Sequence, residues 1–444
     1  MKFYDRQSEL EELALLYRQA SKAARMTVLT GRRRVGKTIL ALESAREQSC
    51  LYLFVSRKSE ALLCAEYLDE IKRRFPVPVI GDIRTFKDVF ALLVEVCRTQ
   101  RLTVIIDEFQ EFLSVNPAVY SEIQNLWDLN KASCKMNLIL IGSVYSLMHR
   151  IFQDNKEPLF GRADRFMILK PFSIATLWEI LSDAGVNSTG LLFDYYAFTG
   201  GLPTYVELLV TNKAFSHAKI VDFMLHQNSP FLQEGRHVLI EEFGKDHGTY
   251  FSILELIAAG RTARPQIESI LEANVGGFFD RLEHDYAIVA KVKPFNAKPL
   301  SRLQRYRIVD NFLCFWFRFI YRNRSAVETG NFAYAKDILK RDYSTYCGRM
   351  LEWFYHDLFA ATGNYNLIGS YWERDNQNEI DLVAVNDIKK TIVLADIKLD
   401  KARISLANLR KRSERLLAGY RRYQPEFIGL SLADIGKYLP NRKS

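Results

Sequence analysis

Eight residues near the start of the chain have the types and spacing needed to hold the phosphates of a nucleotide. Residues 31–38 read Gly-Arg-Arg-Arg-Val-Gly-Lys-Thr, the pattern G-x-x-x-x-G-K-T. Its two glycines allow a tight turn that aims backbone N–H groups at phosphate oxygens. Lys37 would reach the β- and γ-phosphates, and the Thr38 hydroxyl would ligate Mg²⁺. The loop alone does not select ATP over GTP. We expect an ATP and Mg²⁺ site formed by Gly31, Arg32, Arg33, Arg34, Val35, Gly36, Lys37, Thr38 and Ile39.

A pair of acids ends a later apolar run. Residues 103–106 are Thr-Val-Ile-Ile, and Asp107 and Glu108 follow them. Asp107 would orient Mg²⁺ through its water shell. Glu108 would polarise the attacking water as a general base. An ordinary acidic turn is the alternative, but a strand-end Asp-Glu pair together with a phosphate-binding loop is more specific than either pattern alone.

Two further polar residues are candidates for sensing or stabilising the phosphates. Ser143 follows the apolar run at 137–141, where a polar side chain could sense the γ-phosphate. A Gly-Ser pair after a strand is, however, more often a helix N-cap. Arg162, and likewise Arg165, could stabilise charge on the transferred phosphoryl group as an arginine finger. For any single arginine, a surface ion pair is the commoner role.

A second group of charged residues lies near the C-terminus. Glu379-Ile-Asp381 begins one apolar run, and Asp396-Ile-Lys398 ends the next. Residues at i and i+2 lie on one face of a strand, so Asp396 and Lys398 would point the same way. A hairpin would bring Asp381 beside them, and Glu352 on a preceding helix is a further candidate ligand. The carboxylates would hold a divalent metal, and Lys398 would position a water or stabilise a phosphate. The alternatives are a folded but inactive site and an ordinary charged hairpin.

The net charge of +9 is concentrated at the C-terminal end. Residues 401–444 hold 11 Lys and Arg against 3 Asp and Glu, a difference of +8. A helix expected at 405–420 carries Arg410, Lys411, Arg412 and Arg415 opposite an apolar stripe. This basic region predicts a polyanion partner, most simply DNA, with salt-sensitive binding. A solvated surface helix would show the same pattern.

The elements that position these residues follow from hydrophobic periodicity. Short, doubly apolar strands at 26–30, 51–55, 101–106 and 137–141 alternate with helical patterns, which indicates a parallel sheet covered on both faces. Residues 174–243 read as helical, which suggests a lid or a bundle. From residue 250, three short helices precede a ribbon at 286–293 and 306–309, the order of a winged helix. Its third helix has a mixed charge, which favours a protein-contacting spacer slightly over DNA contact.

Composition narrows the class of protein. Hydrophobic residues make up 48% and charged residues 25%, which is ordinary for a soluble globular protein. The apolar run at 312–321 is too short to span a bilayer. The N-terminus lacks the apolar core of a signal peptide. The six cysteines show neither zinc-ligand nor disulfide spacing. We therefore expect a cytoplasmic protein without a membrane segment.

The motifs together resemble those of archaeal-type ATPases in the STAND/AAA+ group of P-loop NTPases. They are Asp5-Arg6 with Glu9-Leu10, GRRRVGKT, VIIDEFQ, IGSV, PLFGR and GGLPTY, in that order. The resemblance implies a helical lid and a winged helix, and it makes Ser143 a sensor and Arg162 an arginine finger or sensor. Gly201-Leu202-Pro203 matches a G-x-P motif, which implies that Pro203 lies near the nucleotide base.

The end of the chain resembles the PD-(D/E)xK nuclease-like domain often fused to these ATPases, and residues 307–317 match the start of that domain. The fold expected is α/β: a P-loop NTPase core with a parallel sheet at 1–173, a helical lid at 174–244, a winged helix at 245–309 and a C-terminal α/β nuclease-like domain at 310–444. The function expected is an ATP-hydrolysing, nucleotide-gated switch that controls the action of the C-terminal domain on nucleic acid.

Two rivals to that function stay open. One is a STAND-like signalling or scaffold ATPase, in which ATP controls assembly and the other domains bind proteins. The other is a DNA-binding ATPase whose nuclease-like site is inactive. A homo-oligomer is compatible with each of these functions, and the sequence does not fix the oligomeric state, the choice between DNA and RNA, or the pathway.

Overall fold

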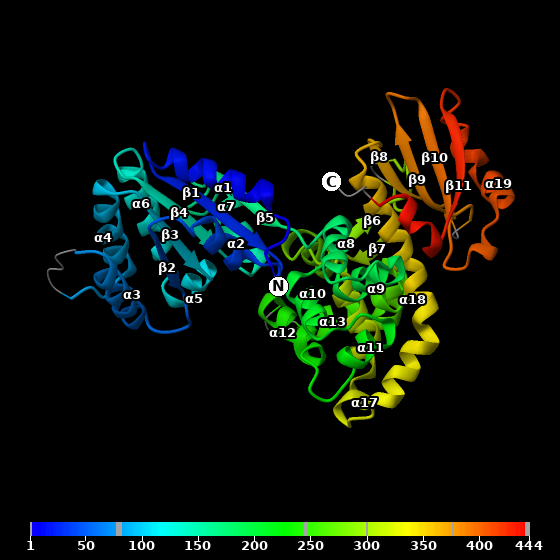
Figure 1. Cartoon of the computed structure of the whole chain (residues 1–444), viewed down its shortest axis with the longest axis horizontal. Helices are drawn as coiled ribbons and strands as arrows, with labels where there is room; N and C mark the ends of the chain where they lie inside the picture. Colours follow the sequence, from blue (N-terminus) through cyan, green and yellow to red (C-terminus); the bar gives the residue numbers. More distant parts are fainter. Residues whose placement is uncertain (1, 77–81, 244–246, 299–300, 375–376, 440–444) are drawn as a thin grey trace. The chain divides into compact units, whose positions relative to one another are not determined.

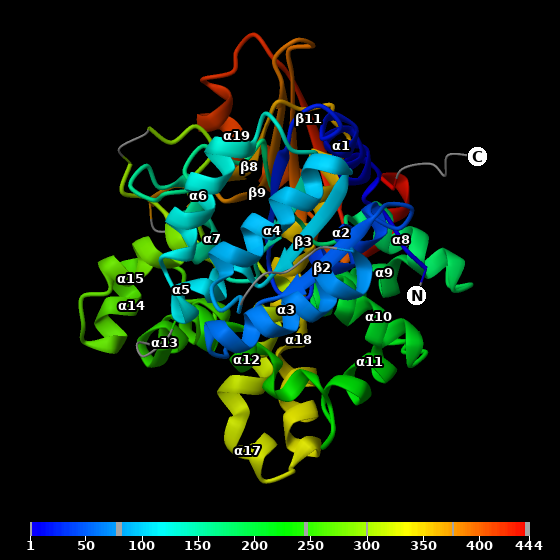
Figure 2. The ribbon, with the colours of Figure 1, turned by 90° about the vertical axis from the view of Figure 1, so that its left-hand side faces the viewer.

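The computed structural model describes residues 2–76, 82–243, 247–298, 301–374 and 377–439. The chain divides into two compact units (Figure 1), and the first of them faces the viewer in Figure 2. Residues 4–170 form the first unit, and residues 171–444 with the first three residues form the second. The finer division of the second unit at residues 244 and 309 stays a prediction, and the first of these boundaries lies outside the described residues.

The first unit is built on a parallel five-stranded sheet with the order β2-β3-β4-β1-β5. Its inner strands are buried on both faces, as their continuous apolar runs require. This confirms the expected parallel α/β core. The edge strand β5 is half-exposed and was not predicted. The strands are β1 (Arg25–Gly31), β2 (Cys50–Phe54), β3 (Leu102–Asp107), β4 (Met136–Ile141) and β5 (Arg165–Leu169).

Helices cover this sheet. Five of them, α3 to α7, share one apolar core with the strands, whereas α1 and α2 pack against β1. Alternate strand residues such as Val28, Leu53 and Leu138 enter that core. The helices are α1 (Gln7–Gln19), α2 (Lys37–Ser44), α3 (Glu60–Arg74), α4 (Phe86–Thr99), α5 (Phe112–Val115), α6 (Val119–Asn130) and α7 (Tyr145–Gln153).

The second unit begins with a wholly helical segment, as the sequence indicates. Apolar residues at helical spacing are buried, and serine side chains cap several helix starts. Gly200 and Gly201, both at positive φ, separate α9 from α10. The helices are α8 (Ile174–Asp183), α9 (Thr189–Thr199), α10 (Pro203–Thr211), α11 (His217–Met224) and α12 (Phe231–Phe243).

Three helices and an antiparallel ribbon follow in the order expected for a winged helix. They are α13 (His247–Ala258), α14 (Arg264–Leu271), α15 (Gly276–Asp280), β6 (Val289–Val292) and β7 (Arg305–Ile308). The ribbon is joined to the C-terminal sheet. The backbone N–H of Phe295 donates to the carbonyl of Ser370 at 2.7 Å, and the Phe295 ring belongs to the core of that sheet.

The C-terminal part combines a long helix with a four-stranded sheet. Its helices are α16 (Asn311–Phe315), α17 (Arg324–Glu328), α18 (Phe332–Ala361) and α19 (Leu406–Leu417). The sheet has the order β11-β10-β9-β8, from β8 (Leu367–Tyr371), β9 (Ile380–Asn386), β10 (Thr391–Ile397) and β11 (Gln424–Leu430). The expected hairpin is the β9–β10 pair. Across the described segments, no helix has the length and apolarity that a membrane crossing requires.

Candidate functional site

The phosphate-binding loop connects β1 to α2 in the first unit. Gly31 has a φ of +143°, and a Cβ there would lie 2.6 Å from the carbonyl oxygen of Leu169. Gly36 has a φ of +91° and directly precedes α2. Both positions therefore need glycine, one for close packing and both for conformation. The loop delivers the chain to the amino end of α2, where backbone N–H groups and the helix dipole favour an anion.

Lys37 is the first residue of α2 and is buried. Its Nζ donates to the carbonyl oxygens of Gly31 at 2.9 Å and of Arg32 at 3.1 Å. These bonds fold the ammonium group over the loop that it would share with a nucleotide. A phosphate bound in the loop would thus find a positive charge already in place.

Asp107 lies at the carboxyl end of β3, facing the start of α2. Its Oδ2 accepts hydrogen bonds from the Thr38 hydroxyl at 2.7 Å and from the Tyr52 hydroxyl at 2.9 Å. Its Oδ1 accepts from the backbone N–H of Glu108 at 2.8 Å. Burial and the charge of Asp107 raise the pKa of Tyr52, so its hydroxyl remains a donor. Thr38 and Asp107 bring together two hard oxygen donors, the set that fits Mg²⁺.

Glu108 adopts a left-handed conformation with a φ of +53°. Its Oε2 accepts from the Ser143 hydroxyl at 2.6 Å and from Nε2 of Gln110 at 2.5 Å. Ser143 reaches Glu108 because β4 lies between β1 and β3 in the sheet. The structure therefore pairs the expected sensor with the expected general base. Gln110 was not singled out from the sequence, although it lies in the motif VIIDEFQ.

Arg6 supports the loop from the N-terminal segment. The side chain is buried, and its Nη2 donates to the carbonyl oxygens of Lys170 at 2.6 Å and Val35 at 3.4 Å. Its Nη1 also pairs with Glu9 at 3.3 Å. Only the family resemblance drew attention to Arg6 and Glu9. The geometry gives Arg6 a structural reason to accompany this loop.

Arg162 lies at the edge of the sheet opposite the phosphate-binding loop. It precedes Arg165, which pairs with Thr27 near the amino end of β1, whereas the phosphate-binding loop follows the carboxyl end. Its Nη2 pairs with Asp128 at 3.0 Å, and its Nη1 donates to the Phe160 carbonyl. The structure therefore gives Arg162 a surface ion pair, and its expected role as a sensor or an arginine finger stays a prediction.

Pro203 begins α10 in the second unit. The preceding Gly201 has a φ of +73°, and a Cβ there would lie 2.5 Å from the Phe172 carbonyl oxygen. The backbone N–H of Phe172 in turn donates to the Gly201 carbonyl at 2.8 Å. The Gly-Leu-Pro segment thus has a packing role within its own unit. The expected contact of Pro203 with a nucleotide base stays a prediction.

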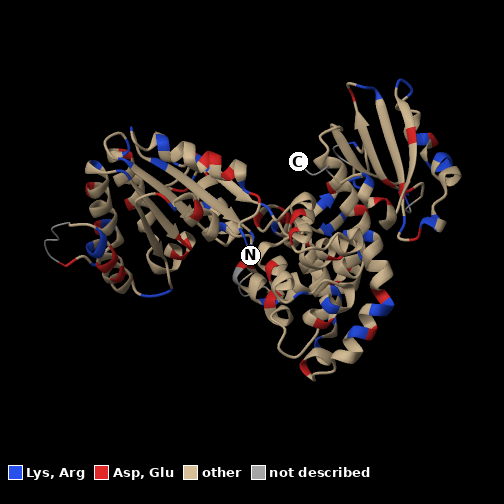
Figure 3. Ribbon diagram, in the orientation of Figure 1, with Lys and Arg blue, Asp and Glu red and all other residues tan. Residues whose placement is uncertain are grey.

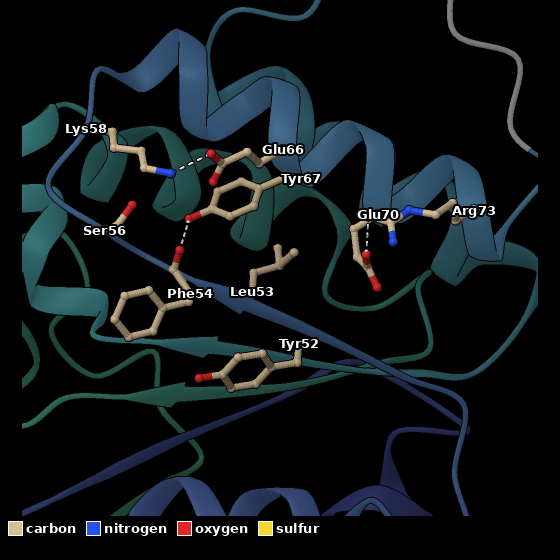
Figure 4. Close-up of a pocket in the computed structure, with 9 residues that line it drawn as sticks. All are labelled: Tyr52, Leu53, Phe54, Ser56, Lys58, Glu66, Tyr67, Glu70 and Arg73. Atoms are coloured by element: carbon tan, nitrogen blue, oxygen red, sulfur yellow. Dashed lines mark hydrogen bonds and ion pairs between the residues drawn. The ribbon is translucent and has the colours of Figure 1, made fainter.

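A cavity of about 380 Å³ opens along the outer edge of β2 (Figure 4). Tyr52 and Tyr67 both line it, but their hydroxyls have different partners. The Tyr67 hydroxyl donates to the Phe54 carbonyl at 2.8 Å, whereas that of Tyr52 donates to Asp107. The full lining is Tyr52, Leu53, Phe54, Ser56, Lys58, Glu66, Tyr67, Glu70 and Arg73. One wall of this cavity therefore touches the candidate magnesium ligand.

The C-terminal hairpin brings the second group of residues together. Nζ of Lys398 lies 2.9 Å from Oδ2 of Asp381 and 3.1 Å from Oδ1 of Asp396. Asp381 also accepts from the backbone N–H of Ile397 at 2.7 Å. Strand alternation thus placed these three side chains correctly. Lys398, however, bridges the carboxylates that were expected to hold a metal.

Arg412 adds a second cation to this group. Its Nη2 lies 3.1 Å from Oδ1 of Asp396, whose Oδ2 accepts from the Ser405 N–H at 3.2 Å. Burial would raise the pKa of Asp396, but the Ser405 N–H and the two cations lower it below its usual range. In the described parts of the chain, no three His, Cys, Asp or Glu side chains are arranged to hold a metal ion. The metal roles of Asp381 and Asp396 stay predictions.

Glu352 lies on α18, and the charges of residues on and beside the hairpin affect its pKa. Burial, followed by the charges of Asp381 and Glu379, raises the pKa of Glu352 to about 8. Burial also raises the pKa of Asp381, against the opposing effect of Lys398. Glu352 therefore carries a proton at neutral pH in this arrangement. Its expected role as a metal ligand would require it to lose that proton, and the role stays a prediction.

The basic residues of α19 have different surroundings. Arg412 points into the carboxylate group, and Arg415 pairs with Glu373 at 2.9 Å. Arg410 stacks over the ring of Phe427 at 5.3 Å, and Lys411 is exposed. Figure 3 shows the lysines and arginines along α19. The positive charge is present, but only part of it faces outward.

Comparisons with known proteins agree with this geometry. Residues 3–209 match a family described as "ATPase domain predominantly from Archaea", and residues 316–413 match one described as "Archaea bacterial proteins of unknown function". An uncharacterized protein of Methanocaldococcus jannaschii is 29% identical over 410 residues, which cover 89% of this chain and 87% of that protein.

Among solved structures, a Walker-type ATPase of Pyrococcus abyssi is similar, with a TM-score of 0.54 and 16% identity. The match covers 71% of this chain and 96% of that one, and at this identity it concerns the fold alone. The fold, the phosphate-binding loop and the two family matches lead to one conclusion. Residues 3–209 form a P-loop ATPase domain that hydrolyses ATP and is similar to the archaeal ATPase family, and residues 316–413 are similar to a family of archaeal and bacterial proteins of unknown function.

Proposed function

We propose that this ATPase is a nucleotide-gated switch whose C-terminal domain acts on nucleic acid. The observation that supports the ATPase part most directly is the chain of hydrogen bonds from Thr38 through Asp107 to Glu108 and Ser143. It joins the expected metal ligands, the general base and the sensor at the carboxyl ends of adjacent strands. Small molecules bind at that edge of open α/β sheets.

Each residue has a defined task in this proposal. The loop amides and Lys37 hold the β- and γ-phosphates, and Thr38 with Asp107 holds Mg²⁺. When bound, the metal neutralises charge on the phosphates. Glu108 accepts a proton from the attacking water, so it must turn one carboxylate oxygen toward that water. Its hydrogen bonds to Ser143 and Gln110 compete for that oxygen and therefore set how readily it acts.

The proposed link to nucleic acid rests on charge near the second acidic group. The helix α19 bears the exposed residues Arg410 and Lys411, and it also bears Arg412, which pairs with Asp396. Phosphates of a polyanion would be attracted to this helix. Lys398 is well placed to contact a phosphate once it is released from the carboxylates. We propose DNA as the partner.

A cleavage assay tests the nucleic-acid part. Plasmid and single-stranded DNA are incubated with the full chain, Mg²⁺ or Mn²⁺, and with or without ATP. The control is the double variant Asp396→Ala, Lys398→Ala. Cutting by the wild type alone supports a nuclease controlled by ATP. If both proteins bind DNA without cutting it, a DNA-binding ATPase with an inactive site is supported. If the protein does not bind DNA and does not cut it, the nucleic-acid part of the proposal is contradicted.

A second candidate function is a signalling or scaffold ATPase with protein partners. The observation in its favour is that Asp396 already forms ion pairs with Lys398 and Arg412, as in a structural ion-pair network. ATP would then control assembly, and Arg162 would serve a neighbouring copy. Light scattering with ATP, ADP and no nucleotide tests this function. Nucleotide-dependent assembly without affinity for DNA would favour it over the switch.

A further inference from the structure

Tyr52 lines the β2 cavity, and its side chain contacts Asp107, the candidate magnesium ligand. Its hydroxyl donates to Oδ2 of Asp107 at 2.9 Å, the same oxygen that accepts from Thr38 at 2.7 Å. Strand pairing explains the reach. Phe54 pairs with Asp107, and Tyr52 lies two residues earlier on the same face of β2.

The two hydroxyls and one backbone N–H fix the Asp107 carboxylate. Oδ2 accepts hydrogen bonds from the hydroxyls of Thr38 and Tyr52, and Oδ1 accepts one from the backbone N–H of Glu108. Because a hydroxyl has one proton and two lone pairs, Thr38 can donate to Asp107 and still offer an oxygen to a metal. Tyr52 has no such second task here. It is therefore the side chain that can hold the carboxylate in place while Thr38 engages the metal.

We propose that Tyr52 is a positioning residue of the ATPase site, which orients Asp107 so that Mg²⁺ binds with ATP. Outer partners of metal-ligating carboxylates set the orientation of the ligand, and their loss costs about 10- to 100-fold in metal affinity or activity. Tyr52 lies on the edge strand, outside the loop and the strand-end motifs. The contact adds a residue to the site from an element that the motifs do not include.

Tyr67 provides a matched control for the loss of the Tyr52 hydroxyl. Both tyrosines line the same cavity and donate one hydrogen bond within the same unit. Tyr67 is 4% exposed, and its hydroxyl donates to the main-chain carbonyl of Phe54. Tyr67→Phe therefore removes one hydroxyl and its hydrogen bond from the same cavity without touching Asp107.

The experiment measures ATP binding by calorimetry in the full chain, first with EDTA and then across a Mg²⁺ titration. Wild type, Tyr52→Phe and Tyr67→Phe are compared, with melting temperatures recorded for each. We expect all three to bind ATP equally without metal. Tyr52→Phe needs about tenfold more Mg²⁺ for half of the metal-dependent gain in affinity, and Tyr67→Phe matches the wild type.

Hydrolysis rates give a second measurement. In Tyr52→Phe, kcat falls at low Mg²⁺ and returns toward the wild-type value at saturating Mg²⁺ or Mn²⁺, because the metal then orders the carboxylate. An unchanged Mg²⁺ midpoint in Tyr52→Phe overturns the proposal. An equal shift in both variants also overturns it, because the effect would then belong to packing at the β2 edge. Should Tyr52→Phe melt well below Tyr67→Phe, Tyr52→Leu provides a second variant without the hydroxyl donor, and the same criteria apply to it.

Discussion

The two groups of acidic side chains in this chain differ in the charge of the groups that contact them. In the first unit, Asp107 and Glu108 accept hydrogen bonds from the neutral groups of Thr38, Tyr52, Ser143 and Gln110. In the C-terminal hairpin, Asp381 and Asp396 are paired with the cations Lys398 and Arg412. Neutral donors orient a carboxylate and leave its negative charge available, whereas cations compensate that charge.

This difference predicts different affinities for metal ions. Mg²⁺ bound with ATP at the first site gains the full charge of Asp107. A metal at the second site must displace or share with Lys398 and Arg412, so its affinity should be lower without a polyanion to draw those cations away. We therefore expect the first site to bind Mg²⁺ with ATP as it stands, and the second site to need a polyanion before it binds a metal ion.

The largest effect is expected for Lys37→Ala. Lys37 supplies the positive charge of the loop and also bonds to the carbonyls of Gly31 and Arg32. Its removal should weaken ATP binding by about 100-fold or more, because a charge-assisted contact and the loop shape are lost together. Titration calorimetry measures this effect. The control Lys398→Ala removes a lysine from the other acidic group and should keep wild-type ATP affinity; retained affinity in Lys37→Ala would contradict the loop's role.

A smaller effect is expected for Ser143→Ala. Glu108 loses the hydroxyl that lies 2.6 Å from its Oε2 but keeps the amide of Gln110. We expect kcat to fall about tenfold, while KM for ATP changes by less than about twofold, since the phosphate contacts remain. Steady-state hydrolysis measures both constants. A large loss of ATP affinity with kcat unchanged would mean that Ser143 contacts the nucleotide instead of controlling Glu108.

At the second site, Arg412→Ala should strengthen metal binding. The change leaves Asp396 paired with Lys398 alone, so more of its charge is available to a metal. We expect Mn²⁺ affinity in nucleotide-free protein to rise about fivefold, measured by electron paramagnetic resonance. Lys411→Ala on the same helix is the matched control, because Lys411 is exposed. Equal Mn²⁺ affinities in Arg412→Ala and the wild type would show that Arg412 does not lower metal affinity at the second site.

The smallest effect concerns pH and Glu352. Burial and neighbouring acids raise its pKa to about 8 from an ordinary 4.5, so the folded state holds this proton more tightly than the unfolded state. Stability is therefore fully present below the unfolded pKa and falls as pH rises toward 8. Glu352→Gln should remove this dependence and raise the melting temperature by about 2 °C or more at pH 8, with little change near pH 5.

Thermal melts of both proteins across that pH range measure this effect. The difference between the variant and the wild type should grow as the pH rises, because only the wild type must hold or lose the proton. A constant difference at every pH would show that Glu352 does not titrate in this range.

Local pattern was enough to predict one part of the ATPase site. The loop at 31–38 and the acids at 107 and 108 are recognisable because glycine spacing and strand ends are local features. Asp381, Asp396 and Lys398 were also predicted together, since alternation along a hairpin fixes which residues share a face. These predictions needed no knowledge of which distant strands are neighbours.

The misses have a common physical cause. Tyr52 reaches Asp107 because β2 pairs with β3, and Arg412 reaches Asp396 because α19 packs on β10, neither of which is a local feature. The strand β5 was not recognised, and because it begins at Arg165 beside Thr27, Arg162 lies at the edge of the sheet opposite the phosphate-binding loop. Long-range pairing, not residue type, decided each case.

The role of Glu108 as the general base is tested by comparing Glu108→Gln with the wild type in ATP binding and in hydrolysis with Mg²⁺. The change keeps the size of the side chain and removes its ability to accept a proton. We expect wild-type ATP affinity and a loss of about 100-fold or more in kcat. Hydrolysis at the wild-type rate would contradict it, because the acid held by Ser143 and Gln110 would then not be the general base.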